Sequence, residues 1–500
     1  MSASPIITNR RWHARPLYLV LFPLFTLGHD INGLFGFIPL SLAMQYLLLL
    51  FLLSVCSWVA VFASTRNKYK ASSITLCVVV AFVFYGSVSD WAAHLSPKLA
   101  SFKVLPLLLL AGAAVLGVYW QRNEARGRKI TTFLNWLLIL FVLAELGTSV
   151  YHYARYREHH NRIYTSFPLS SGFESKLPDS AKPDIFLLLM DEYAGPRSLK
   201  QMGFNNQPFL DSLQQLGLWV AQESRSNYDF TPFSVSSLLQ MQYIDSPQQH
   251  RGNDAPTVLR AVRSISDNET VRILRKEGYD IRYEVPFDNS IHPKNTLNEF
   301  GDFAYKQLFG NTLAGRLRRN LHLDIDPAGS LFPAHFDYGD VAKRRADIAG
   351  YREGLDAAID SKAARPPRFV YQHLLITHHP YLFGPGGQPR NKMASAAEEA
   401  QAYLEQVRYA NSVLLAQVVR IRTQGRRNTV ILVLSDHGYR HSVRKDEAFE
   451  NLEALYLPGE DYEGLQANQT PVNAFRIVFN HAFGQRWPLL PQRSIPVKYQ

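Results

Sequence analysis

Asp436 and His437 are the residues best suited to chemistry, and they follow the apolar run TVILVLS. Six β-branched or aliphatic residues in a row predict a buried strand, and ligands gather beyond the carboxyl ends of strands in open α/β sheets. The pair offers a carboxylate oxygen and an imidazole nitrogen, which suit Zn²⁺ or Mn²⁺, and Gly438 lets the backbone turn away. An isolated DHG is better explained as a helix N-cap followed by a surface histidine.

A second apolar run favours a metal site. Residues 184–190 (DIFLLLM) also end in acid, at Asp191 and Glu192. Two buried strands that end in carboxylates can place like charges at one sheet edge, which is costly unless a cation or a proton lies between them. We therefore expect a divalent cation there. The alternative is that Asp191 caps the next helix while Glu192 is solvated.

Thr231 is the candidate nucleophile. It precedes a proline in the segment NYDFTPFSVSSLLQM, so it is predicted to be the N-cap of a helix. Backbone N–H groups at a helix start favour a phosphate or sulfate, and a cation beside the hydroxyl would lower its pKa. A plain cap is the alternative. Ser234, Ser236 and Ser237 are rival hydroxyls, but they lie inside the predicted helix, where small residues more often serve packing.

Histidines follow a third strand-like run. In the segment HLLITHHPY, His378 or His379 could bind an anion or protonate a leaving group. We expect His373 to be a structural histidine within the strand. His441 follows His437 by four residues and would share a helix face with it if a helix starts there, as a second ligand or as polar surface.

The elements that position these residues alternate between strand-like and helical patterns beyond residue 183. This alternation is typical of an α/β domain with a largely parallel sheet. The predicted strands are residues 184–190, 217–221, 279–284, 368–376, 429–434 and 453–457. The predicted helices include residues 205–216, 231–242, 255–277 and 396–423. Residues 286–342 are irregular and polar, and form a candidate substrate-facing insertion.

The first third of the chain predicts a membrane domain. The chain is 47% hydrophobic and 19% charged, and the apolar excess lies in its first third. Five segments there are each near the length needed to cross a bilayer: residues 16–36, 39–64, 73–94, 103–120 and 132–152. The first contains His29 and Asp30, so a short or partly re-entrant span is the alternative.

Basic residues predict the orientation of these spans. Arginines and lysines cluster at residues 10–15, 66–70 and 122–129, which are alternate connections. The positive-inside rule therefore places the N-terminus in the cytoplasm and everything beyond residue 153 outside. The predicted domains are a transmembrane domain (1–153), an interfacial helix and linker (154–183) and an extracytoplasmic catalytic domain (184–500). For residues 151–164, a solvated linker helix is as compatible as an interfacial one.

Cysteine content and charge fit an exported domain. Both cysteines, Cys56 and Cys77, lie in predicted membrane helices, so the exported domain has no disulfide and depends on its own core. The net charge of +11 is partly a topology signal, and the remainder favours a surface near anionic lipid headgroups. A nucleic-acid partner is disfavoured by the external location and by the lack of a recognition motif.

Taken in order, the segments FLLLMDEY, NYDFTPFSVSSLL, THHPY and LSDHG resemble the alkaline phosphatase and sulfatase superfamily. The resemblance is greatest to its membrane-anchored branch of lipoteichoic acid synthases and phosphoethanolamine transferases, which share the layout of five membrane helices and an external catalytic domain. It implies an α-helical membrane domain followed by a sulfatase-like α/β domain with a largely parallel central sheet.

The resemblance also implies a divalent metal, with Zn²⁺ or Mn²⁺ favoured and Ca²⁺ or Mg²⁺ as alternatives. The implied metal ligands are Asp191, Thr231, Asp436 and His437. Thr231 looks like the nucleophile, and His378 looks like the histidine near the transferred group. Additional candidates for the site are Glu192, His379 and His441.

The nucleophile position separates the branches of the superfamily. Thr231 falls where sulfatases have a cysteine that becomes formylglycine, and threonine cannot undergo that conversion. A threonine nucleophile is what the transferase branch uses. Asp191, however, stands where those transferases usually have glutamate, and the exported domain lacks the disulfides common in phosphoethanolamine transferases.

The resemblance therefore implies an enzyme of the bacterial inner membrane whose catalytic domain faces the periplasm or cell exterior. Its predicted reaction is metal-dependent transfer of a phosphoethanolamine or phosphoglycerol head group from a membrane phospholipid donor to an envelope glycan or lipid acceptor, through a phospho-threonine. One alternative is a sulfatase-like hydrolase of phosphate or sulfate esters. Another, from a different class, is a non-catalytic membrane protein that binds an anionic glycan.

Overall fold

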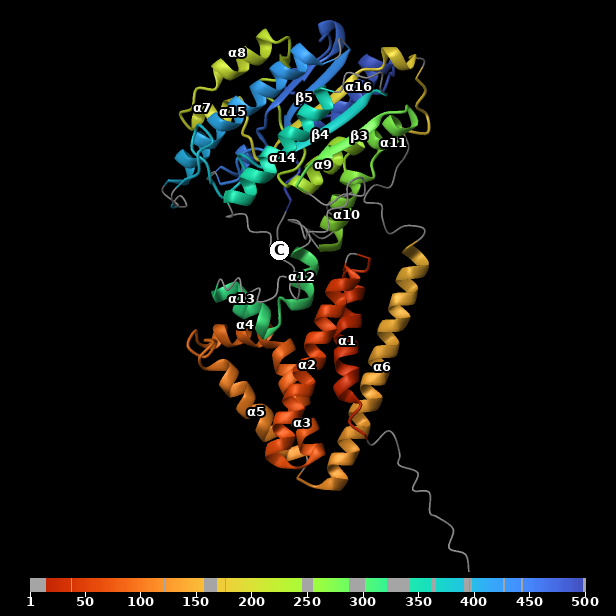
Figure 1. Ribbon diagram of the computed structural model, residues 1–500, viewed down its shortest axis with the longest axis vertical. Helices are drawn as coiled ribbons and strands as arrows, with labels where there is room; N and C mark the ends of the chain where they lie inside the picture. The colour runs from red at the N-terminus through yellow and green to blue at the C-terminus, as the bar shows by residue number, and fades with distance from the viewer. Residues whose placement is uncertain are drawn as a thin grey trace, which may run out of the picture. The chain divides into compact units, whose positions relative to one another are not determined.

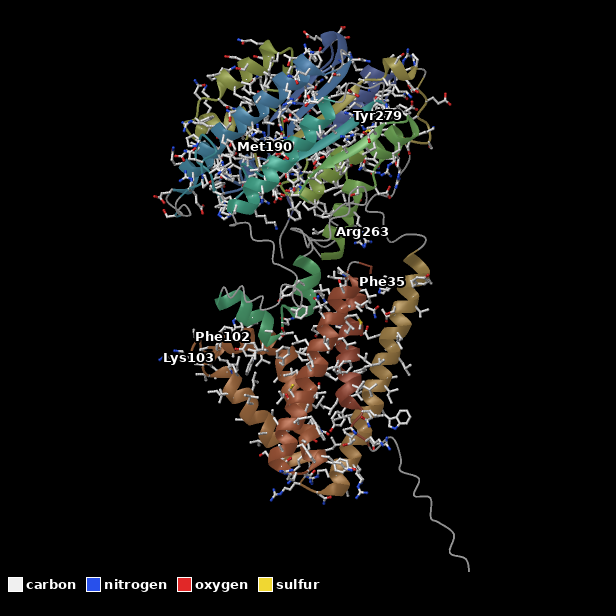
Figure 2. The ribbon with its side chains drawn as sticks, in the orientation of Figure 1. Phe35, Phe102, Lys103, Met190, Arg263 and Tyr279 are labelled. Atoms are coloured by element: carbon white, nitrogen blue, oxygen red, sulfur yellow. The ribbon has the colours of Figure 1, made fainter. Side chains whose placement is uncertain are left out.

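The computed structural model of the chain divides into two compact units (Figures 1 and 2). The helical unit comprises Met1–His160 and Gly301–His335, and the sheet unit comprises Asn161–Phe300 and Phe336–Gln500. The structure describes residues 15–36, 38–120, 122–156, 169–175, 177–244, 255–286, 302–321, 341–360, 366–390, 395, 398–425, 428–441 and 444–497.

A six-stranded sheet forms the centre of the sheet unit (Figure 1). The strands are β1 (Asp184–Met190), β2 (Trp219–Val220), β3 (Asp280–Glu284), β4 (Arg368–Leu374), β5 (Thr429–Ser435) and β6 (Glu453–Tyr456). Their order is β2-β6-β5-β1-β4-β3, and only the pairings made by β6 are antiparallel. All six predicted strands and the largely parallel sheet are confirmed. β1, β4 and β5 are buried at every position, which explains their nearly continuous apolar sequences.

Helices cover the sheet. They are α7 (Pro196–Gln201), α8 (Gln207–Gln215), α9 (Thr231–Gln240), α10 (Ala255–Ser266), α11 (Glu269–Lys276), α14 (Val341–Asp360), α15 (Glu399–Gln424) and α16 (Ala474–Phe483). Alternate strand residues face opposite sides: Phe186 of β1 shares a core with α14 and α15, while Phe369 of β4 contacts Phe475 of α16. The prediction of one helix over residues 255–277 is wrong, because Asn268 caps α11 by accepting the Val271 N–H at 2.9 Å.

The helical unit contains α1 (Tyr18–Gly33), α2 (Leu40–Thr65), α3 (Lys68–Val83), α4 (Tyr85–Leu95), α5 (Leu105–Trp120), α6 (Glu124–Tyr156), α12 (Asp302–Phe309) and α13 (Leu313–Leu321). Every predicted apolar segment is helical, but the prediction of five spans is corrected. Among the described residues, two helices, α2 and most of α6, have the length and composition to cross a bilayer, and α3 with α4 makes a third if the bent pair is one span. α1 and α5, at 16 residues each, fall short of the roughly 20 residues that a span needs.

Two other expectations for this unit also change. The end of α6 includes residues 151–156 of the predicted interfacial helix, whereas residues 157–164 lie outside the described part of the chain. A single helix over residues 73–94 is wrong, because the chain bends by 70° between α3 and α4. At the bend Phe84 leaves the helical conformation, and the Gly86 N–H bonds to the Asn311 carbonyl at 2.7 Å. A carbonyl from another segment thus accepts a hydrogen bond from an N–H group in the first turn of α4.

Polar side chains link α1 to α6 between their apolar surfaces. Glu145 accepts a hydrogen bond from Asn32 Nδ2 at 2.7 Å and lies 3.0 Å from His29 Nδ1. Ser149 donates to Asn32 Oδ1 at 2.8 Å. Polar groups between apolar helices are stabilised by such partners, so the network fixes α1 against α6.

Residues 302–321 come between β3 and β4 in the sequence but pack within the helical unit. The expected irregular structure is wrong for this segment, which forms α12 and α13; residues 287–301 and 322–340 lie outside the described residues, and the substrate-facing role stays a prediction. Phe309 is fully buried and meets Tyr46 edge-on, with ring centroids 5.3 Å apart. Arg316 donates to both carboxylate oxygens of Asp90, at 2.7 and 2.5 Å. The segment is therefore part of the core of the helical unit.

This packing makes Phe309→Ala a strongly destabilising change. Removing a buried aromatic side chain typically costs about 3–5 kcal/mol, so thermal unfolding of the full-length protein should move to lower temperature. Phe309→Leu keeps most of the buried volume and should cause a smaller shift. Equal melting temperatures for wild type and the alanine variant would show that α12 does not contribute to the core.

Glu453 on β6 predicts a pH dependence of stability. Its side chain is fully buried, Ser224 donates to one carboxylate oxygen at 2.8 Å, and burial raises its pKa from 4.5 to about 7 although the Ser224 bond lowers it. Between pH 4.5 and 7 the folded protein keeps a proton that the unfolded chain has released, so the free energy of unfolding falls as the pH rises.

Glu453→Gln removes this titration and should stabilise the protein more at about pH 8 than at about pH 5. Each unit of pKa shift corresponds to about 1.4 kcal/mol, so the change is large enough to measure by thermal unfolding at both pH values. Glu463→Gln, at an exposed position, is the matched control. A gain for Glu453→Gln that is the same at both pH values would contradict the raised pKa.

Candidate functional site

The candidate site lies at the carboxyl ends of β1, β4 and β5, which are neighbours in the sheet. Asp191 directly follows β1, whose last residue is Met190 (Figure 2), and Asp436 directly follows β5. His373 is the last residue but one of β4. The parallel register aligns the ends of the three strands. Side chains from segments far apart in the sequence therefore meet at one sheet edge, where open α/β sheets bind ligands.

Asp191, His373 and Asp436 form a buried group that fits a metal ion. Their ligand atoms all lie within 4.8 Å of one another, and His373 Nε2 is 3.0 Å from Asp191 Oδ2. Within the described part of the chain, no hydrogen bond reaches Asp191 Oδ1 or Asp436 Oδ2. Buried carboxylate oxygens without partners are costly, and a divalent cation would satisfy both.

Thr231 and His437 lie beside this group. Thr231 Oγ1 is 3.4 Å from Asp191 Oδ2 and 3.4 Å from His437 Nε2. His437 Nε2 is 3.3 Å from Asp436 Oδ2, while its Nδ1 lies 2.9 Å from the Gly438 carbonyl. That carbonyl can only accept a hydrogen bond, so Nδ1 carries the proton and the lone pair of Nε2 points to the site. The four residues implied by the resemblance thus come together, with His373 as a fifth.

The predicted capping role of Thr231 is wrong. Thr231 is the first residue of α9, and Phe230 is the N-cap, with φ −144° and no side-chain capping bond. The Thr231 hydroxyl instead contacts Asp191 and His437. A hydroxyl that does not cap the helix can take part in chemistry at the sheet edge.

Electrostatics distinguish the two carboxyl groups. Burial, reinforced by the Asp436 carboxylate, raises the pKa of Asp191 well above its usual range. Burial also raises the pKa of Asp436, but His437, His373 and the hydrogen bonds to Asp436 outweigh it, so the net pKa is lowered. Two adjacent buried carboxylates repel each other, and a proton or a cation between them relieves the repulsion.

His378 lies next to Arg440, with Nε2 3.4 Å from Arg440 Nη2. Burial, with Arg440 and Arg344 nearby, lowers the pKa of His378 well below its usual range, so the ring is neutral near pH 7. Its Nδ1 is hydrogen-bonded to the His379 carbonyl, which leaves Nε2 as an acceptor for the guanidinium. This geometry favours His378 as the residue that orients Arg440 and does not favour a proton donor.

Glu192, His379 and His441 form a separate group. Glu192 adopts a left-handed backbone conformation (φ 57°). Its carboxylate accepts a hydrogen bond from the backbone N–H of Arg440 at 3.0 Å and lies 3.8 Å from His441 Nε2. The His379 and His441 rings are 5.2 Å apart. His437 lies in a bend, residues 438–439 are irregular and residues 440–441 form a turn, so the condition for a helix face shared by His437 and His441 is not met. Among the described residues, these three side chains are outside the metal-ligand group of Asp191, His373 and Asp436.

Sequence reasoning missed His373, Tyr371 and Arg440 as residues of the site. His373 does lie within a strand, as expected, but its Nε2 faces Asp191 and its Nδ1 lies 2.8 Å from the Tyr371 hydroxyl. The available signal was position: His373 is near the end of a strand predicted for the same sheet edge, and residues two apart in a strand share a face. Nothing in the sequence indicated that the Arg440 backbone N–H would bond to the Glu192 carboxylate.

The Sulfatase family model matches residues 183–485, and no curated protein sequence matches the chain. Similar solved structures include the C-terminal periplasmic domain of EcEptC from Escherichia coli, at 12% identity and a TM-score of 0.39, covering 64% of this chain and 86% of that one. Lipooligosaccharide phosphoethanolamine transferase A from Neisseria meningitidis has 12% identity and a TM-score of 0.39, with 94% of each chain covered. Phosphonate monoester hydrolase of Agrobacterium radiobacter has 15% identity and a TM-score of 0.34, covering 60% and 74%.

The family model covers more than half of the chain, so the protein belongs to the sulfatase family and is a sulfatase-like enzyme. Its architecture is an apolar helical region with two or three candidate spans, followed by a sulfatase-like α/β domain. The predicted superfamily is therefore confirmed.

Asp436→Asn should sharply reduce metal binding. Loss of a residue that only supports a ligand typically weakens metal affinity by about 10- to 100-fold, and loss of a ligand should exceed that. Elemental analysis of the full-length protein after dialysis should find a divalent metal in wild type and in the exposed control Asp211→Asn. If the Asp436→Asn protein retained the wild-type metal content, Asp436 would not be a ligand.

Proposed function

We propose that the enzyme transfers a phosphoryl head group, of the phosphoethanolamine or phosphoglycerol type, from a membrane phospholipid to an envelope glycan or lipid. Thr231 is the nucleophile, and a phospho-threonine is the intermediate. The observation that carries this proposal is the position of Thr231 Oγ1, 3.4 Å from both Asp191 Oδ2 and His437 Nε2 at the start of α9. Threonine at this position cannot supply the formylglycine of a sulfatase.

The proposed reaction has two balanced steps. First, Thr231 Oγ1 forms a bond to phosphorus while the bond from phosphorus to the diacylglycerol oxygen breaks, and the threonine proton ends on diacylglycerol. Second, the acceptor hydroxyl oxygen forms a bond to phosphorus while the bond to Thr231 breaks, and the acceptor proton returns to the threonine. The head group moves without a net change of charge on the protein.

The proposed metal ligands are Asp191, His373, Asp436, His437 and Thr231. Bound there, a divalent cation such as Zn²⁺ or Mn²⁺ would lower the pKa of the hydroxyl and stabilise negative charge on the phosphoryl group. Arg440 donates its backbone N–H to Glu192, and its guanidinium, 3.4 Å from His378 Nε2, can pair with phosphoryl oxygens. The start of α9 adds backbone N–H groups that favour an anion.

The helical unit supports a lipid donor. Apolar helices long enough to span a bilayer hold the enzyme at the membrane, which raises the effective concentration of phospholipid head groups. If the bent pair α3 and α4 is one span, it makes three spans with α2 and α6 in the described part of the chain, and an odd number places the N-terminus and the sheet unit on opposite sides of the membrane. Arginines before the first helix favour a cytoplasmic N-terminus, which makes the sheet unit extracytoplasmic. We accordingly propose the bacterial inner membrane as the location, with the site facing the periplasm or cell exterior.

Peptide mass mapping tests the nucleophile. After full-length wild-type protein is mixed with phosphatidylethanolamine or phosphatidylglycerol, the peptide containing Thr231 should carry the matching phosphoryl head group. Thr231→Ala should carry none, and its turnover should fall by about 10³-fold or more, as is typical for loss of a nucleophile. Ser234→Ala, one turn further along α9, is the matched control and should still form the adduct.

Three outcomes would contradict the proposal in different ways. An adduct on Ser234 would assign another nucleophile. Full turnover by Thr231→Ala would exclude a phospho-threonine. Release of diacylglycerol and free phosphoryl head group that is unaffected by any glycan or lipid acceptor would identify a hydrolase.

A further inference from the structure

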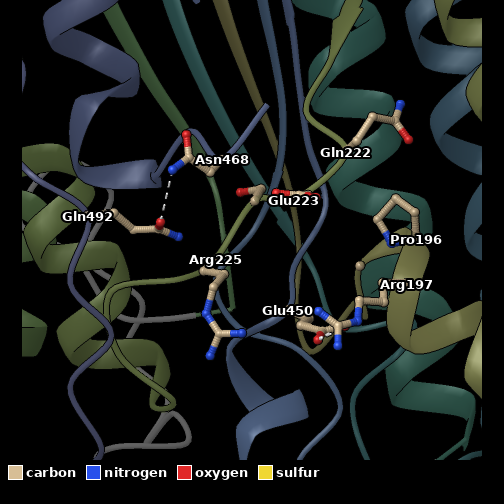
Figure 3. A pocket seen from close by; sticks show the side chains of 10 residues that line it. Pro196, Arg197, Gln222, Glu223, Arg225, Glu450, Asn468 and Gln492 are labelled. Carbon is tan, nitrogen blue, oxygen red and sulfur yellow. Dashed lines mark hydrogen bonds and ion pairs between the residues drawn. The ribbon is translucent and has the colours of Figure 1, made fainter. Parts of the chain in front are cut away.

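A cavity of about 230 Å³ in the sheet unit has no role in the chemistry described above (Figure 3). The segment after β1, the segment after β2, the loop before β6 and the C-terminal segment line it. Its polar lining includes Arg197, Arg225, Glu223, Glu450, Asn468 and Gln492. Figure 3 shows Arg197 beside Glu450, and Gln492 turned toward Asn468.

The charges of the lining cancel. Arg197 and Arg225 contribute two positive charges, and Glu223 and Glu450 contribute two negative charges. Arg197 Nε lies 3.7 Å from Glu450 Oε1, and Arg225 donates to Asp446 at 2.5 Å. A phosphate or sulfate would therefore meet arginines that already have acidic partners, together with a carboxylate that repels it. The cavity suits a neutral ligand.

Two polar atoms in the lining lack partners. Within the described residues, Glu450 Oε2 and Gln492 Nε2 are buried and make no hydrogen bond. The Glu450 side chain is only 9% exposed. The first atom is an acceptor and the second a donor, and leaving either one unsatisfied is costly. A ligand hydroxyl can donate to the carboxylate, and another can accept from the amide.

The cavity shares a wall with the candidate active site. The Gly195 N–H bonds to the Glu450 carbonyl at 2.8 Å, and Gly195 follows Asp191 by four residues. On the other side, a Cβ added to Gly438 would lie 2.2 Å from the same Glu450 carbonyl. The backbone of Glu450 therefore contacts the segments that carry Asp191 and His437. The cavity and the candidate active site therefore adjoin the same backbone segment at Glu450.

We propose that this cavity binds one sugar unit with neighbouring hydroxyl groups and is the subsite for the acceptor glycan. The role as acceptor subsite rests on the proposed transferase function, whereas sugar binding does not. Arg197 and Gln492 Nε2 donate to sugar oxygens, and Glu450 Oε2 and Asn468 accept from sugar hydroxyls. Among the described residues that line the cavity, none has an aromatic side chain, so recognition depends on hydrogen bonds along the edge of the sugar.

Direct binding tests the sugar site without turnover. Full-length Thr231→Ala protein in phospholipid nanodiscs, which contain no sugar detergent, is titrated with methyl glucoside, methyl N-acetylglucosaminide or inorganic phosphate, with saturation-transfer NMR as the readout. A sugar should bind saturably. Adding Arg197→Ala or Gln492→Ala should weaken its binding at least about fivefold, the size expected for loss of one hydrogen bond. Arg352→Ala, an exposed arginine on α14 outside the cavity, should have no effect.

Three results of this titration would overturn the proposal. The first is the absence of saturable sugar binding. The second is sugar binding that Arg197→Ala and Gln492→Ala leave unchanged. The third is phosphate binding that those variants abolish, because it would identify an anion site.

Kinetics then test the acceptor role. With an otherwise wild-type enzyme, Arg197→Ala should raise the KM for a glycan acceptor by a factor similar to the loss of sugar binding, while cleavage of the donor without acceptor stays unchanged. An unchanged acceptor KM would overturn the role as acceptor subsite. If wild type binds the sugar but transfers no head group to any acceptor, the proposed function fails and the sugar site stands.

Discussion

Two buried carboxyl groups side by side at a sheet edge are the constraint on which the site depends. Asp191 and Asp436 would repel each other in a low-dielectric interior; burial and the Asp436 carboxylate raise the pKa of Asp191, whereas His437 and His373 outweigh burial and lower the pKa of Asp436. Polar groups lie around the two carboxyl groups. The imidazoles of His373 and His437 face them, and the Thr231 hydroxyl approaches Asp191. A divalent cation satisfies the same requirement, which is why the geometry that concentrates negative charge also suits metal-assisted chemistry.

The sheet holds these two carboxyl groups close together in spite of their repulsion. β1, β4 and β5 are parallel neighbours buried on both faces, so their ends are held rigidly in register. Beyond the strands, Glu192 turns the chain through a left-handed conformation, and Tyr403 holds this turn by donating to the Glu192 carbonyl at 2.9 Å while accepting the Ala194 N–H at 2.8 Å. A strained turn at a functional site persists only when its surroundings fix it in this way.

The helical unit differs from the sheet unit, because its sequence is dominated by apolar residues, many of them exposed on the helix surfaces. Length and composition predict that its segments are helical, but packing determines how each one ends. The bend after Val83 depends on a carbonyl from Asn311, a residue more than 200 positions away in the sequence. α12 and α13 likewise belong to this unit because Phe309 and Arg316 find partners on α2 and α4, although both helices interrupt the sequence of the sheet unit.

The sequence alone determined the six strands, the largely parallel sheet, the superfamily and the approach of Asp191, Asp436, His437 and Thr231, because buried strands leave a continuous apolar signal and their carboxyl ends must meet at one edge. It did not determine the break at Asn268, the bend at Phe84, the N-cap at Phe230 or the place of Arg440. Each of these depends on hydrogen bonds or ion pairs with distant residues, or on small differences between backbone conformations. His373 is the clearest example of this difference. Its strand was predictable from the sequence, but only the tertiary structure decided that its Nε2 faces Asp191. The reason is that the direction of this side chain depends on the register of two strands about 180 residues apart.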